Sequence, residues 1–148
     1  MSLARRQALI SLLIWSLVLT GLVAMFLYVG PEQFSDPGFG RYRLAAAAII
    51  LPGYVAHFWS LWKSRRGRSE GELDELDALV ARRASEITLV VVSVVVFGAG
   101  IVLWEAYRDV GAAPAGWFHL MAYGTVALVS LVHSGARLLV DSAGPGDG

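Results

Sequence analysis

The sequence predicts an all-α integral membrane protein. The expected fold is a four-helix bundle with up-down-up-down spans, whose third span is continuous with a long cytoplasmic amphipathic helix. Composition is the first reason: 56% of the 148 residues are hydrophobic, 16% are charged, and mean hydropathy is +0.59. Soluble domains carry about 25% charged residues. The second reason is that the apolar residues fall into four blocks. Residues 1–140 are therefore expected to form one transmembrane domain.

The first span is predicted over residues 8–29, which hold no charge. A span needs about 20 apolar residues, and this run exceeds the roughly 7–15 of a cleavable signal peptide. We therefore expect an uncleaved span, which ends at Gly30-Pro31. Small residues at every fourth position are expected to permit close helix packing. They are Ser16, Thr20 and Ala24.

The second span is predicted over residues 44–62. It too carries a stripe of small residues at every fourth position, namely Ala48, Pro52, Ala56 and Ser60. Proline inside a helix removes a backbone hydrogen bond, so a kink is expected at Pro52. Residues 63–68 (KSRRGR) are expected to form a basic hinge before the next helix.

One long helix is predicted over residues 69–108. Ser69 and Glu72 fit a capping box at its start, and no Gly or Pro interrupts the chain from Glu72 to Phe97. Residues 69–86 are acidic and amphipathic and form the cytoplasmic part. Residues 87–108 form the third span, so we expect no break where the helix enters the membrane.

The acidic part of this helix is a candidate docking surface. Its acids and apolar residues suit a basic partner protein or a second copy of the chain. The residues in this prediction are Glu72, Leu73, Asp74, Glu75, Leu76 and Val80. The alternative is a solvated helix whose leucine face rests on the membrane surface, and the sequence leaves the two open.

The fourth span is predicted over residues 117–138, after a turn at 109–116, and the tail 141–148 is expected to be disordered. Nine of the twelve basic residues lie on one side of this topology. They are Arg5, Arg6, Lys63, Arg65, Arg66, Arg68, Arg82, Arg83 and Arg137. Because short loops rich in Lys and Arg stay in the cytoplasm, both termini are expected to face the cytoplasm from the inner (plasma) membrane.

Two histidines are expected at one depth near the cytoplasmic surface. His57 lies on the second span and His133 on the fourth. Two imidazoles on different helices are suited to ligate a b-type haem, with Arg137 placed to meet a propionate. The alternative is that each histidine is hydrogen-bonded within the protein or reaches water at the membrane interface. A haem site would make the chain an electron-transfer protein.

Two other polar groupings are candidates, because polar residues in a bilayer are costly. Trp15, Tyr54 and His57 lie at similar depths below Pro52, and a pocket lined by them would suit a small amphiphile transporter. Near the outer surface, Glu105 and His119 are placed to exchange a proton or form a charge-assisted hydrogen bond. Arg108 is the alternative partner for Glu105.

The sequence argues against several function classes. There is no cysteine, which removes thiolate chemistry, and the net charge of zero gives no sign of nucleic acid as a partner. No acid lies at the middle of any predicted span, which disfavours ion-coupled transport. We therefore expect a non-enzymatic membrane protein. It would be an accessory, structural or regulatory subunit in the lipid bilayer, forming a homo-oligomer or binding a larger membrane complex.

Residues 44–108 resemble a loose group of small prokaryotic four-span membrane proteins of unknown function. In that group two hairpins of spans are joined by a segment with an acidic motif and a basic-Ala dipeptide before the third span. The matching residues here are Asp74, Glu75, Leu76 and Asp77, followed by Arg83-Ala84. The group usually has Arg where this chain has Leu76. The resemblance implies a four-span membrane protein and no particular activity.

Overall fold

Helices make up the described part of the chain. The computed structural model describes residues 3–35, 38, 40–65 and 75–143, and no strand occurs among them. The helices are α1 (Leu3–Val29), α2 (Pro31–Ser35), α3 (Gly40–Arg65), α4 (Glu75–Tyr107) and α5 (Gly116–Ala143). The prediction of an all-α fold is confirmed.

Three of the described helices are long and apolar enough to cross a membrane. The qualifying stretches are Arg5–Val29 in α1, Ala78–Tyr107 in α4 and Gly116–Ser142 in α5. Each exceeds the roughly 20 residues that a bilayer core requires. The predicted second span, α3, is not among the three. Its start carries Arg41 and Arg43, and Gly53, Tyr54 and His57 interrupt the apolar run of its described part.

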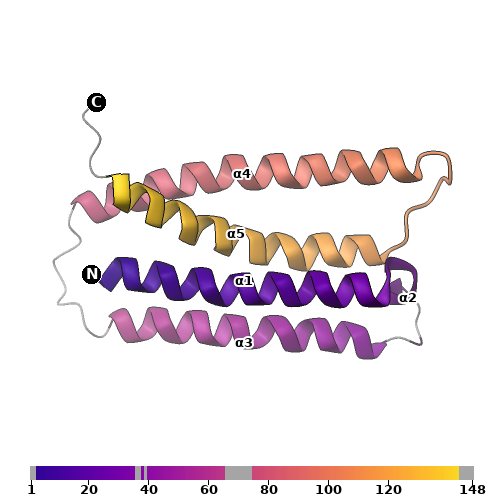
Figure 1. Cartoon of the computed structure of the whole chain (residues 1–148), viewed down its shortest axis with the longest axis horizontal. Helices are drawn as coiled ribbons and strands as arrows, with labels where there is room; N and C mark the ends of the chain where they lie inside the picture. The colour runs from indigo at the N-terminus through magenta and orange to yellow at the C-terminus, as the bar shows by residue number, and fades with distance from the viewer. Residues whose placement is uncertain (1–2, 36–37, 39, 66–74, 144–148) are drawn as a thin grey trace.

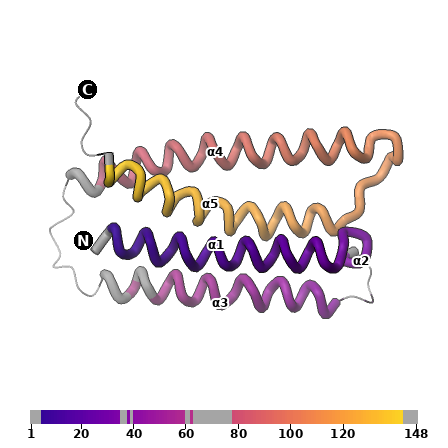
Figure 2. Tube along the Cα trace, viewed as in Figure 1, coloured from indigo at the N-terminus to yellow at the C-terminus, as the bar shows by residue number. Residues whose placement is uncertain are grey.

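The four long helices lie side by side in an open row in the order α3, α1, α5, α4 (Figure 1). The central helices α1 and α5 pack against each other, while α3 packs on α1 and α4 packs on α5. The tube trace shows the same order (Figure 2). The predicted closed bundle makes the second and third spans neighbours, yet α3 and α4 lie at opposite edges. Lipid tails are as apolar as leucine, so no hydrophobic force closes the row.

The first span ends where the sequence predicts. Gly30 has φ of +83°, which suits a glycine, and its N–H donates to the carbonyl of Phe26 at 2.8 Å. Pro31 then begins the short helix α2, which was not predicted. Its Phe34 is 2% exposed and lies with its ring centroid 5.6 Å from that of Phe26. Helix α2 therefore contributes Phe34 to the core.

Two helices extend beyond the C-terminal ends predicted for their spans. Helix α3 continues through Arg65, so the first three residues of the predicted basic hinge at 63–68 are helical. Helix α5 continues to Ala143, so the predicted disordered tail begins with three helical residues. Residues 63–65 and 141–143 contain no Gly or Pro that would end these helices. The nearest glycines in the sequence, Gly67 and Gly144, come later. The rest of both segments lies outside the described residues.

The long helix α4 is continuous from Glu75 to Tyr107. It passes from a charged segment, where Arg82 bonds Glu86 at 3.2 Å, into the apolar stretch without a break. This confirms the predicted continuity. The predicted start at Ser69 lies outside the described residues.

Most described residues of the predicted small-residue stripes are not packed within the chain, although Ser16 is half-buried. Thr20 and Ala24 on α1 are exposed, as are Ala48, Pro52 and Ala56 on α3. These helices approach closely at Gly53 instead, where an added Cβ would lie 2.7 Å from Cγ2 of Val18. A repeat of four identifies small faces, but which face packs depends on the neighbours.

Candidate functional site

An inner polar cluster joins three helices and consists of Ser11 and Trp15 on α1, His57 on α3 and Ser134 on α5. Trp15 Nε1–H donates to His57 Nδ1 at 3.4 Å, and Ser11 Oγ lies 3.2 Å from the same nitrogen. Ser134 Oγ lies 2.8 Å from Ser11 Oγ and 2.8 Å from the carbonyl oxygen of Ser130. The cluster is therefore a chain of hydrogen bonds across the row.

The burial of Trp15 assigns the protons in this cluster. Its side chain is wholly buried, and an indole N–H is a donor only, so Nδ1 of His57 must accept. The neutral ring then carries its proton on Nε2. The hydroxyl of Ser11 can share the single lone pair of Nδ1 as a weaker second donor, and that of Ser134 can donate to Ser11. This assignment leaves no buried donor of the cluster unpaired, and unpaired buried donors are costly.

His133 lies near the inner polar cluster. It is close enough to His57 for charges on the two rings to interact, and Arg137 is within the same range of His133. The three residues of the haem hypothesis therefore lie within electrostatic range of one another. A histidine that ligates a metal through one nitrogen normally donates a hydrogen bond from the other. His57 accepts at Nδ1 instead, so haem ligation through Nε2 would leave the Trp15 N–H without an acceptor.

The predicted pocket residues Trp15, Tyr54 and His57 also come together, but they pack on one another. The Trp15 ring meets that of Tyr54 edge to face with centroids 5.2 Å apart, and that of His57 at 5.9 Å. Three surface hollows in the described part of the chain have other linings. The geometry here is that of a packed polar contact between helices.

The predicted outer pair is not formed. Glu105 bonds Arg108 at 2.9 Å, and both side chains are more than half exposed. His119 Nδ1 lies 3.3 Å from the carbonyl oxygen of Ala115, the residue just before its own helix, and its ring packs against Phe34 with centroids 5.8 Å apart. Glu105 therefore takes the alternative partner that the sequence offered. The burial of Phe34, which the sequence did not predict, explains the position of His119.

Two adjoining hollows lie between α4 and α5, toward the helix ends opposite the inner polar cluster. The first has a volume of about 480 Å³ and reaches Leu19 and Val23 of α1; the second has about 430 Å³ and ends at the loop of Gly111. We call them together the outer slot. Four residues line both hollows and so connect them: Leu103, Tyr107, Trp117 and Met121.

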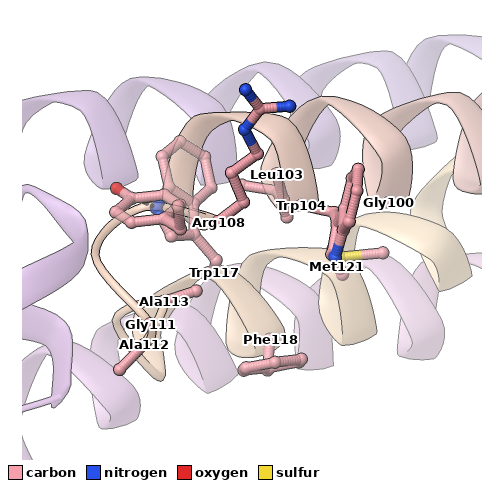
Figure 3. A pocket seen from close by; sticks show the side chains of 11 residues that line it. Gly100, Leu103, Trp104, Arg108, Gly111, Ala112, Ala113, Trp117, Phe118 and Met121 are labelled. Atoms are coloured by element: carbon pink, nitrogen blue, oxygen red, sulfur yellow. Dashed lines mark hydrogen bonds between the residues drawn. The ribbon is translucent and has the colours of Figure 1, made fainter.

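The part of the outer slot nearest the loop of Gly111 is lined by aromatic residues and by Arg108. Tyr107 accepts a hydrogen bond from Trp117 Nε1 at 2.9 Å, which ties the end of α4 to the start of α5. Figure 3 shows the indole of Trp104 extending from α4 toward Met121, and the guanidinium of Arg108 pointing outward to the rim. Neither the slot nor its lining was predicted from the sequence, because its residues are ordinary span residues until two helices face each other.

Most of the predicted docking surface lies outside the described residues. This holds for Glu72, Leu73 and Asp74, and only the helical backbone is described for Glu75 and Leu76. Val80 is half-buried. The docking role of this segment stays a prediction.

Ser11 and Ser134 are the site residues that sequence reasoning missed. The spacing of four between Ser11 and Trp15 places both on one face of a helix, and that was the available signal. Their partners are on other helices and are set by packing. Comparison with protein-family models, curated proteins and solved structures finds no match to this chain.

Proposed function

We propose that this chain is a non-enzymatic accessory, structural or regulatory subunit of the inner (plasma) membrane that associates through α4. In this proposal α3 is also a span, the four long helices cross up-down-up-down, and both termini lie in the cytoplasm. Support for α3 as a span comes from its length of 26 residues and its place alongside α1 in the row (Figure 1).

The observation that carries the proposal is an apolar seam on the uncovered side of α4. Exposed apolar residues recur there at alternating spacings of three and four. They are Ile87, Val90, Val94, Phe97, Ile101 and Trp104. Val94 is 66% exposed and Phe97 is 72% exposed, although both lie in the middle of the helix.

This spacing favours contact with another helix. Residues at alternating three and four positions form the seam of a left-handed helix pair, and most transmembrane bundles pack with that geometry. Among the described helices, α5 is the only one that α4 packs against extensively. The seam is therefore open to a second copy or to a helix of a larger complex. We give priority to self-association because the seam repeats over two full heptad steps of one helix.

Single cysteines test the seam, because the chain contains none of its own. Val94→Cys and Phe97→Cys should form disulfide-linked dimers when oxidised in native membranes. Leu89→Cys is the matched control, since Leu89 is equally exposed on α4 but lies off the seam. Equal cross-linking at all three positions, or at none of them, would contradict self-association through the seam.

A second pair of cysteines tests the number of spans. Gln33→Cys precedes α3, and Asp109→Cys follows α4. If α3 crosses the membrane, an impermeant maleimide should label both from the outer side of intact cells. Labelling of Gln33→Cys alone would mean that α3 does not cross, and the proposed topology would be wrong.

A further inference from the structure

The outer slot changes character along its length. Its deeper part is lined by aliphatic and small residues of three helices, including Leu19, Ala99 and Gly124. Its mouth is lined by Trp104, by Trp117 and by the stem of Arg108. In membrane proteins Trp and Tyr gather at the level of the lipid headgroups. The slot therefore matches an amphiphile with an apolar chain inside and a polar head at the mouth.

Two glycines that line the outer slot have open space beside them. A Cβ added at Gly100 or at Gly124 would meet nothing within 4 Å. Each hollow has a volume in the range of about 300–1,000 Å³ that small-molecule sites occupy. The opening faces the bilayer in the proposed topology, so a membrane lipid has direct access.

The charges at the mouth select the head. Arg108 lines the mouth, and its guanidinium lies 2.9 Å from Glu105 and 3.5 Å from Asp109, which stand beside the slot without lining it; the three charges sum to −1. An anionic head would face two carboxylates, and a cationic head would face the guanidinium. A zwitterionic head satisfies both signs, with its phosphate on Arg108 and its ammonium on the carboxylates.

We infer that the outer slot binds one zwitterionic phospholipid, with an acyl chain along Gly124 and the headgroup at Arg108. This binding does not depend on the apolar seam, because only Trp104 belongs to both surfaces. The bound lipid fills the space where α4 and α5 separate and so holds the outer ends of these helices in place.

The test is native mass spectrometry of the full chain purified in a mild detergent, before and after removal of lipid. Delipidated protein is titrated with phosphatidylethanolamine, phosphatidylcholine and phosphatidylglycerol in the same detergent. The two zwitterionic lipids should bind one per chain, at least about tenfold more tightly than phosphatidylglycerol. Equal or tighter binding of phosphatidylglycerol would overturn the choice of head.

Filling the slot should remove the lipid. Gly100→Leu and Gly124→Leu should each lower the affinity for phosphatidylethanolamine about tenfold or more. Gly98→Leu is the control, because it also lies on α4 with open space around it but lines neither hollow of the outer slot. Retained binding in both slot variants, or equal loss in the control, would overturn the proposal. The proposal would also be overturned if the purified wild-type chain carried no lipid and a slot variant nevertheless failed to dimerise. The slot would then serve helix packing and not lipid binding.

A surface variant tests the head without disturbing the helices. Arg108 is about half exposed, so Arg108→Gln should leave helix content unchanged while weakening the binding of both zwitterionic lipids about tenfold. Glu105→Gln combined with Asp109→Asn should shift the preference toward phosphatidylglycerol. If neither variant changes the lipid preference, the headgroup does not lie at Arg108.

Discussion

Replacing His57 with leucine removes the acceptor at the centre of the inner polar cluster and puts an apolar side chain of similar size in its place. The indole N–H of the wholly buried Trp15 and the hydroxyl of Ser11 then lose their common partner. A buried donor without a partner costs about 1–3 kcal/mol. Measured hydrogen bonds between membrane helices average about 0.6 and reach about 1.7 kcal/mol. Because two donors share this acceptor, we expect His57→Leu to lower the free energy of unfolding by about 1.5 kcal/mol.

Unfolding by sodium dodecyl sulfate in mixed micelles, followed by circular dichroism, measures this loss. His57→Asn is the matched control, because its side chain places an oxygen acceptor near the position of Nδ1 and should recover most of the loss. In a double-mutant cycle, Trp15→Phe should cost about 1 kcal/mol less in the leucine background than in the wild-type chain. A coupling near zero, or equal losses for leucine and asparagine, would refute the assigned hydrogen bonds.

A valine at Gly53 should lower the free energy of unfolding by about 1–3 kcal/mol, because its Cβ would lie 2.7 Å from Cγ2 of Val18. Gly98→Val, with open space around it, should change the same free energy by less than about 1 kcal/mol, and similar losses would contradict the close approach of α1 and α3. Phe34→Ala should cost about 3–5 kcal/mol in thermal unfolding in detergent, because the ring is 2% exposed. A cost below about 1 kcal/mol would mean that α2 is not part of the core. Haem b added to the purified chain should give no bis-histidine absorption spectrum, because Nδ1 of His57 is already an acceptor. A Soret band that disappears in His57→Ala would contradict this.

The candidate site was predictable in part. Depth along the spans placed Trp15, Tyr54 and His57 at one level, and the structure brings them together. Depth alone also suggested that Glu105 pairs with His119, which is wrong. Glu105 has Arg108 three residues on, directly after the end of its helix, and a partner this close in sequence needs no particular packing of neighbouring helices.

The sequence by itself determined the four long helices, but not α2. In a bilayer each backbone N–H and C=O must be bonded within the element, so an uninterrupted apolar block becomes a helix wherever its neighbours lie. The same local logic ends α1 at Gly30, which adopts a positive φ. It also carries α4 unbroken from its charged start into its apolar part.

Only the tertiary structure decided the order of the helices, and with it the inner polar cluster and the outer slot. Apolar helices gain little by choosing one apolar neighbour over another in lipid. The choice therefore depends on local fit, such as Gly53 against Val18 and Gly116 against the carbonyl of Pro31. These contacts join residues 35 and 85 positions apart in the chain, and no periodicity within one helix encodes them.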